Sequence, residues 1–185
     1  MRARLLIMSL TLICAVPRPG AAQRMVPDDP TLAVGGDTGF AAARSDEGTI
    51  AFTADAFVEY YVVPRASLRG LYGWARTDLQ TETATALRRR HLLLNVVDNR
   101  DLGALSPFAT AGGGVFFLQP QQGGQPVGAP TTKPGGALGW GVDYFLSEVA
   151  LRTEMTALMA GQEEPDLGAK ALPAFTWTLG VKVPF

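Results

Sequence analysis

The C-terminal segment, 174–185, constrains the fold of this chain more than any other part of its sequence. Large apolar residues occupy every second position there, and small or polar residues separate them. A strict period of two places these two sets of side chains on opposite faces of a β-strand. The apolar set is Phe175, Trp177, Leu179, Val181, Val183 and Phe185. A strand with lipid on one side and a polar interior on the other has this pattern.

The N-terminal segment, 1–22, predicts export. Two arginines precede an apolar stretch, Leu5–Val16, and small residues follow it. This is the layout of a secretory signal peptide. The apolar stretch is shorter than the ~20 residues that span a bilayer as a helix. We therefore expect cleavage after Ala22, which leaves 23–185 as a single domain by length.

The composition limits the remaining classes of protein. The full chain has 16 basic and 17 acidic residues, and loss of the three arginines in the signal peptide leaves 13 basic residues, a net charge near −4. This balance predicts no nucleic-acid partner. The single cysteine, Cys14, would leave with the signal peptide, so no disulfide is expected. No other stretch approaches ~20 consecutive apolar residues, which leaves a soluble exported domain or a β-barrel.

Eight segments have the pattern of strands, each about as long as the 9–11 residues that a tilted membrane strand needs. They are 31–41, 49–61, 66–76, 89–97, 107–118, 135–145, 148–157 and 174–185. The shorter connections are 62–65, 98–106 and 146–147, and the mostly longer ones are 42–48, 77–88, 119–134 and 158–173. Short periplasmic turns that alternate with long outer loops are typical of membrane barrels. The sequence therefore predicts an all-β fold, an eight-stranded antiparallel up-and-down transmembrane β-barrel.

Charged residues gather on one face of these strands. In 49–61, for example, Asp55 and Glu59 lie opposite Phe52 and Val58. The charges on this polar face are Asp37, Asp55, Glu59, Arg69, Asp143, Arg152, Glu154 and Lys182. The lumen of an eight-stranded barrel is only wide enough for side chains to fill it, and buried charges must be paired. We predict a lumen charge network that plugs the barrel, with a transport path as the alternative.

Aromatic and small residues support the same arrangement. Tyr60, Phe108, Tyr144 and Phe185 are predicted near the periplasmic end, and Phe40, Phe52, Trp74, Phe116 and Trp177 near the outer end. Two aromatic belts are typical of the two membrane interfaces. Frequent glycines suit a narrow barrel, in which inward side chains would otherwise collide. The fourth strand is ambiguous because Leu92–Leu94 are consecutive, although Asn95 is expected to point inward.

Four stretches carry a resemblance to a known family: 57–69, with a turn around Pro64, and 107–114, 139–145 and 180–185. Through them the chain resembles the small outer-membrane β-barrels of OmpA-transmembrane or OmpX type over nearly all of its mature length. The resemblance implies a monomer in the bacterial outer membrane. It also implies that the barrel assembly machinery reads the terminal strand as an assembly signal, carried by Trp177, Leu179, Val181, Val183 and Phe185. The peptidoglycan-binding domain of longer relatives is not expected after Phe185.

His91 is the only histidine. Some small outer-membrane barrels modify lipid A with a histidine and a serine, and such a pair needs hydrogen-bond contact. The candidate serines Ser67, Ser106 and Ser147 fall near periplasmic turns, whereas His91 follows the second outer loop. We therefore expect a histidine at the rim or at an interface, and no catalytic residues.

Three consecutive arginines, Arg88, Arg89 and Arg90, stand at the predicted outer end of the fourth strand. Arginine clusters suit phosphate groups, and lipopolysaccharide phosphates lie at this depth. The cluster is a candidate lipid contact, with a solvated charge run as the alternative. The sequence has no metal-ligand spacing and no phosphate loop, so neither a metal nor a cofactor is expected.

These observations predict a non-enzymatic barrel whose outer loops contact lipopolysaccharide or external partners. A narrow pore and a lipid A-modifying enzyme are the alternatives within the same fold. A soluble lipocalin-like barrel remains a further alternative, because the same periodicity with apolar faces inward would produce it. Fold alone does not define function, so the ligand stays open.

Overall fold

The computed structural model describes residues 31–43, 50–78, 86–160 and 174–185. The predicted signal peptide, 1–22, lies outside these ranges. The strands are β1 (Leu32–Ala43), β2 (Ile50–Val63), β3 (Ala66–Asp78), β4 (Ala86–Asn99), β5 (Leu105–Gln122), β6 (Gln125–Pro126), β7 (Thr131–Leu146), β8 (Val149–Ala160) and β9 (Ala174–Pro184). In the same ranges, no helix is long and apolar enough to cross a membrane.

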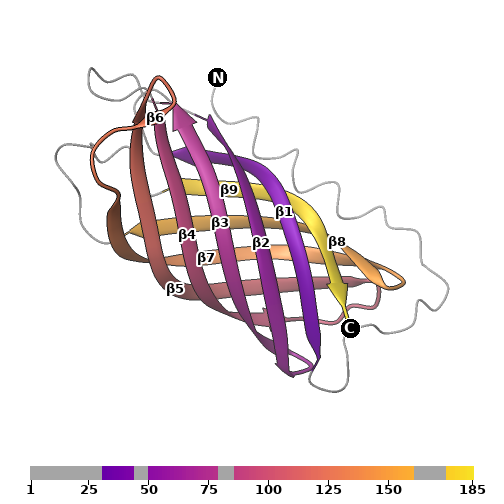
Figure 1. Ribbon diagram of the computed structural model, residues 1–185. Coiled ribbons are helices and arrows are strands. Elements are labelled where there is room, and N and C mark those ends of the chain that lie inside the picture. The colour runs from indigo at the N-terminus through magenta and orange to yellow at the C-terminus, as the bar shows by residue number, and fades with distance from the viewer. Residues whose placement is uncertain (1–30, 44–49, 79–85, 161–173) are drawn as a thin grey trace, which may run out of the picture.

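The strands form one closed antiparallel barrel (Figure 1). The sheet order is β4-β3-β2-β1-β9-β8-β7-β5-β6, and an additional β4–β5 ladder closes it. The two-residue β6 pairs only with the end of β5, so eight strands make the barrel wall. Closure leaves no wall strand with an unpaired edge, which a lipid environment requires. The predicted eight-stranded antiparallel barrel is confirmed.

All eight predicted strands are present, and most extend beyond the predicted ends. The largest extension is in β5, which runs to Gln122, followed by β4, which begins at Ala86, and β7, which begins at Thr131. Apolar alternation ends before the ladders do, because ladder hydrogen bonds continue into the polar sequence at the strand ends. The connection predicted as 98–106 is also shorter, because β4 runs to Asn99 and β5 starts at Leu105.

The first and last strands complete the wall next to each other. β1 pairs with β9 from Ala33↔Pro184 to Ala43↔Ala174. Beyond that ladder, Leu32 N–H donates to the Phe185 carbonyl at 3.2 Å, and Phe185 N–H donates to the Leu32 carbonyl at 2.8 Å. The start of β1 and the C-terminus therefore lie at the same end, together with the short turns (Figure 1).

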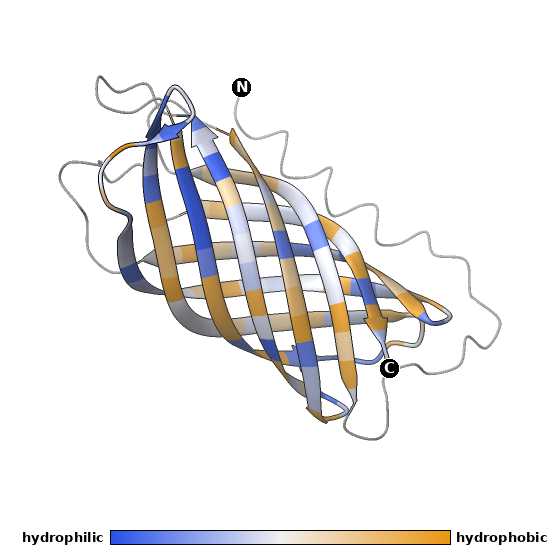
Figure 2. Ribbon diagram, in the orientation of Figure 1, coloured by the Kyte–Doolittle hydropathy of each residue, from blue (hydrophilic) through white to orange (hydrophobic). Residues whose placement is uncertain are grey.

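Apolar side chains cover the outside of the barrel and polar ones fill its inside. Figure 2 shows hydrophobic and hydrophilic residues alternating along most strands. In β9, Leu179 is 55% exposed, whereas Lys182 is 1% exposed. A lipocalin-like barrel would have the opposite arrangement. The reversed, soluble alternative is therefore wrong.

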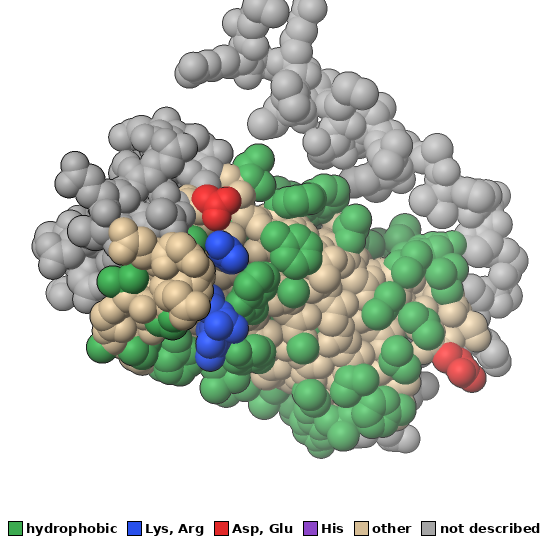
Figure 3. All heavy atoms as spheres, turned by 45° about the horizontal axis from the view of Figure 1, so that its top comes forward, with side chains coloured by type: hydrophobic (Ala, Val, Ile, Leu, Met, Phe, Trp, Pro, Cys, Tyr) green, Lys and Arg blue, Asp and Glu red, His purple; other side chains and the backbone are tan. Residues whose placement is uncertain are grey.

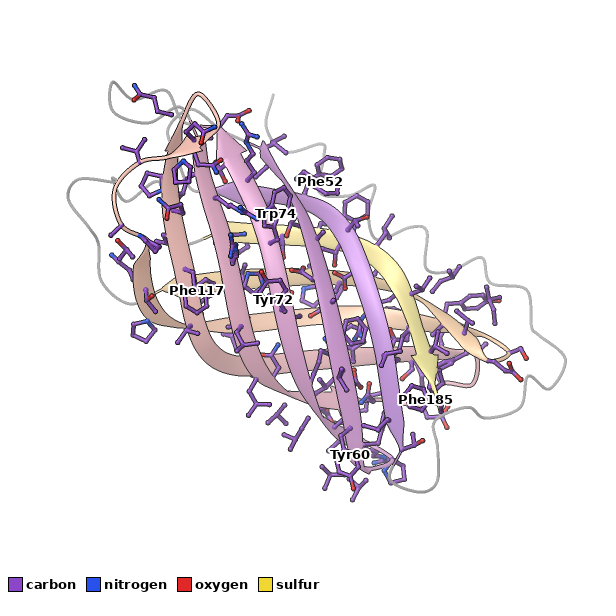
Figure 4. The ribbon with its side chains drawn as sticks, viewed as in Figure 1. Phe52, Tyr60, Tyr72, Trp74, Phe117 and Phe185 are labelled. Carbon is purple, nitrogen blue, oxygen red and sulfur yellow. The ribbon has the colours of Figure 1, made fainter. Side chains whose placement is uncertain are left out.

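The aromatic belts are present, with two changes in membership. Phe52 and Trp74 lie toward the loop end, and Tyr60 and Phe185 toward the other end (Figure 4). Phe108 and Phe116, however, are 4% and 0% exposed and point into the lumen, so their predicted places in the belts are wrong. Sequence parity was ambiguous in β5 because Phe116 and Phe117 are adjacent, and only the ladder shows that Phe117 faces outward.

Glycines make room for large inward side chains from neighbouring strands. A Cβ on Gly73 would stand 2.1 Å from both Asp55 Oδ1 and His91 Nε2. One on Gly135 would stand 2.5 Å from a Phe116 ring atom. These close approaches agree with the prediction that small residues relieve collisions in a narrow lumen.

Candidate functional site

A network of buried charges occupies the lumen on the side of the short turns. Arg69 on β3 donates from Nε to Glu59 at 3.0 Å and from Nη1 to Glu154 at 2.9 Å. Arg152 on β8 lies 3.4 Å from Glu154, 3.5 Å from Asp143 and 3.7 Å from Glu59. These Arg152 contacts are ion pairs that lack hydrogen-bond geometry. Two guanidinium groups therefore share three carboxylates.

Lys182 on β9 completes the network. Its Nζ forms an ion pair with Asp143, lies 3.8 Å from Glu59 and donates to the Tyr61 hydroxyl at 2.8 Å. Ser67 Oγ donates to the second oxygen of Glu59 at 2.7 Å. Three bases and three acids thus balance in charge, as burial of unpaired charges would be unfavourable.

Two aromatic rings hold the guanidinium groups in place. The Phe57 ring lies 5.1 Å from the Arg69 guanidinium carbon and 4.7 Å from that of Arg152. Phe108 lies 5.2 Å and 4.1 Å from the same two groups. Within about 6 Å, an aromatic face attracts a cation. The two rings therefore enclose both arginines and replace part of the water that the arginines lose.

The network crosses the lumen rather than following its wall. Arg69 and Glu154 belong to β3 and β8, and three strands separate these in the sheet. Their 2.9 Å contact can therefore form only through the interior. The side chains of Glu59, Arg69 and Asp143 are 0% exposed. The predicted lumen residues of this half lie together in one layer of ion pairs.

The remaining two predicted lumen acids lie above the network, toward the loops. Asp37 and Asp55 are ladder partners on β1 and β2. They line a cavity of about 20 Å³ together with His91, Asn95 and Glu154. A cavity of that size holds one or two water molecules at most. The predicted interior charges therefore separate into a dense ion-paired layer and a small polar chamber.

His91 lines this chamber and does not lie at the rim. The imidazole is 2% exposed, and its Nε2 lies 3.4 Å from Asp55 Oδ1. Gly73 stands between these two residues in the β2–β3–β4 register, and its missing side chain lets them meet. The rim or interface position predicted for His91 is wrong. His91 and Asn95 are four positions apart on β4, so their side chains lie on the same face of the strand. The expectation that Asn95 points inward was therefore a signal that His91 points inward as well.

The three consecutive arginines divide between the two sides of the wall. Arg89 is 3% exposed and points inward, so the structure separates it from its neighbours. Arg88 and Arg90 face outward on β4, and β3 places Arg76 beside Arg88. Alternation along a strand dictates this division. In the described ranges, Arg88 and Arg90 have no carboxylate partner, whereas Arg76 lies 4.0 Å from Asp78.

The outward arginines lie at the upper edge of the apolar belt. Arg90 stands between Trp74 and Phe117 in the β3–β4–β5 register. In Figure 3, Lys and Arg side chains on the visible face gather where the hydrophobic surface gives way to polar atoms near the loop end. Aromatic rings mark the interface between hydrocarbon and headgroups. Arg88 and Arg90 therefore lie at the loop-side edge of the apolar belt.

Neither a metal centre nor a nucleophile–base pair emerges from the described ranges. No group of three or more His, Cys, Asp or Glu side chains there could hold a metal ion. The partners of Ser67 are Glu59 and Asn99, whereas His91 contacts Asp55. Ser67 and His91 therefore contact different side chains and not each other.

No family model and no curated protein sequence matches this chain. Several solved structures, however, are similar to it in fold. Neisserial surface protein A aligns with a TM-score of 0.68 at 18% identity, over 83% of this chain and 97% of that one. The N-terminal β-barrel domain of Pseudomonas aeruginosa OprF gives 0.55 at 12% identity, over 85% and 100%. The attachment invasion locus protein Ail of Yersinia pestis gives 0.50 at 14%, over 84% and 97%.

The fold is therefore that of the small eight-stranded outer-membrane β-barrels, and the resemblance seen in the sequence is confirmed at this level. At these identities the likeness concerns the fold. Together with the apolar exterior and the two aromatic belts, it supports placement in a bacterial outer membrane.

Proposed function

We propose that this protein is a monomeric, non-enzymatic β-barrel of the Gram-negative outer membrane with a plugged lumen. Its outer end contacts lipopolysaccharide or external partners. The observation that carries the proposal is the layer of six buried charges that crosses the lumen, anchored by the Arg69–Glu154 contact. Because each of these six charges forms an ion pair with an opposite charge, we expect the layer to block the passage of ions through the lumen.

The neighbours of His91 support the non-enzymatic part of the proposal. Acyl transfer or hydrolysis by a serine needs a base within hydrogen-bond reach of the hydroxyl. Ser67 donates to Glu59, which is engaged by Arg69, and His91 contacts Asp55. These contacts fit structural roles.

The outer end and the terminal strand supply the two proposed sets of partners. Arg88 and Arg90 are outward cations at headgroup depth, which suits lipopolysaccharide phosphates. For biogenesis, we propose that the assembly machinery reads β9, whose apolar residues face outward and whose backbone closes the barrel against β1. The assembly residues Trp177, Leu179, Val181, Val183 and Phe185 are those of the sequence prediction.

Three measurements on the full chain, in cells and after purification, test the proposal. Heat-dependent mobility on a gel, with membrane fractionation, should show a folded barrel in the outer membrane. Planar-bilayer recordings should show no steady conductance, and steady conductance would replace the plug with a narrow pore. The lipid A mass spectrum should be the same with and without the protein, and a mass shift would establish a lipid A-modifying enzyme instead.

A further inference from the structure

We propose that a groove on the outer face of the barrel binds one phosphate group of an outer-leaflet lipid. The groove lies over β3, β4 and β5 and has a volume of about 340 Å³. Its lining includes Arg88, Arg90, Tyr72, Phe117 and Gln119. The inference rests on the proposed lipopolysaccharide contact and gives that contact a defined site.

The two arginines supply the binding groups. They stand two residues apart on the outward face of β4, so both guanidinium groups reach the same groove. Arg88 Nε is buried and has no hydrogen-bond partner. A planar guanidinium group matches the geometry of phosphate oxygens and can donate two parallel hydrogen bonds. A phosphate monoester would satisfy both side chains, whereas a neutral lipid would leave them unpaired.

The position of the groove selects a lipid rather than a soluble anion. Tyr72 on β3 and Phe117 on β5 flank β4 on its two sides (Figure 4). They are 49% and 38% exposed, and they form an apolar floor next to the two cations. An amphiphile with a phosphate above and acyl chains below meets both surfaces at once. A free anion would meet only the cations.

The returning segment after β6 forms the opposite wall. Gln119 Nε2 donates to the carbonyls of Val127 and Gly128, both at 3.3 Å, and Val127 N–H donates to the Pro120 carbonyl at 2.9 Å. These bonds hold the segment against β5, so that Pro126 and Pro130 line the groove. A wall fixed in this way before binding lowers the ordering entropy of a complex. Gln119 is thus a positioning residue for the site.

The test uses the full chain folded in phosphatidylcholine vesicles that contain increasing amounts of bis-phosphorylated lipid A. Bound lipid is counted by native mass spectrometry, and the dissociation constant is obtained from the titration. The double variant Arg88→Gln/Arg90→Gln should bind lipid A at least about tenfold more weakly, because it loses two charge-assisted contacts. Its matched control, Arg65→Gln/Arg100→Gln, removes two exposed arginines at the short-turn end and should bind like the wild type.

Further lipids and variants distinguish a failure of the groove from a failure of the lipopolysaccharide contact. Dephosphorylated lipid A should bind the wild type as weakly as the double variant binds lipid A, and Gln119→Ala should weaken binding by a smaller factor. Unchanged affinity in the double variant, with heat-dependent mobility retained, would overturn the groove but leave the lipopolysaccharide contact standing. If the wild type bound phosphorylated and dephosphorylated lipid A with equal affinity, the proposed lipopolysaccharide contact itself would be overturned. Displacement of lipid A by inorganic phosphate at equal phosphate concentration would overturn the choice of a lipid.

Discussion

Arginines of the lumen and arginines of the outer face have opposite surroundings in this barrel. Arg69 and Arg152 are buried, contact carboxylates from other strands and lie against Phe57 and Phe108. The outward Arg88 and Arg90 also lie beside aromatic rings, but no described carboxylate pairs with them.

The difference distinguishes structural charges from binding charges. A buried cation whose partners are all internal stabilises the fold, and removal of either partner leaves an uncompensated charge. An interfacial cation without an internal partner contributes little to folding and remains available to a ligand. Stability and lipid affinity should therefore respond to different arginines.

The largest expected effect is on the lumen side of this comparison. Arg152→Met should lower the free energy of unfolding by about 3–5 kcal/mol, because three carboxylates lose a shared partner. Urea titration of the barrel folded in lipid measures this change in the free energy of unfolding. The matched outer-face variant, Arg90→Met, should stay within about 0.5 kcal/mol of the wild type.

A second change sharpens the interpretation of that result. Glu59→Gln in the Arg152→Met background should recover part of the loss, because Glu59 and Arg152 lie 3.7 Å apart. Strictly additive losses would mean that the two residues do not act in one network.

The next effect concerns the wall that separates the two kinds of arginine. Leu179 faces outward in the middle of β9, and Leu179→Lys should destabilise the inserted barrel by about 2–4 kcal/mol. Leu179→Met serves as the apolar control and should insert normally. The native Lys182 is tolerated on the same strand because it faces the network. Normal insertion of Leu179→Lys would refute the assignment of inside and outside.

A smaller effect should follow from filling a glycine position inside the lumen. Gly73→Ala should destabilise by about 1–3 kcal/mol, because its Cβ would stand 2.1 Å from His91 and Asp55. Gly70 lies on the same strand, and a Cβ there meets nothing within 4 Å. Gly70→Ala should therefore leave the urea midpoint nearly unchanged. Equal midpoints for both variants would show that His91 is not held over Gly73.

The smallest effect on stability should come from the loop that forms the groove wall. Replacing 119–130 with an Asn-Gly turn joins Leu118 to Thr131, which are already ladder partners, and it also removes the β5 partners of Ala86–Arg88. The barrel should stay folded and heat-modifiable, because the β4–β5 ladder from Arg89 to Asn99 remains and loop closure changes the free energy only slowly with length. Lipid A affinity should nevertheless fall. A cut that reached Pro134 would instead remove ladder partners of 115–117.

The sequence by itself determined the number of strands, their order and which face of most strands is apolar. These features depend on alternation within each strand, which is a local property. The terminal strand illustrates this, since Leu179 and Lys182 lie on the sides that parity predicted. The predicted face was wrong for Phe108 and Phe116 in β5, and the arginine run of β4 is divided between the two faces.

Only the tertiary structure decided which charges meet. Arg69 reaches Glu154 across the lumen, and His91 reaches Asp55 over Gly73. Such partners depend on strand tilt and on the stagger between neighbouring strands, which set the level of each side chain in the barrel. The groove beside Arg88 likewise depends on a returning segment held by Gln119. No pattern within a single strand encodes these contacts, because each joins residues of different segments.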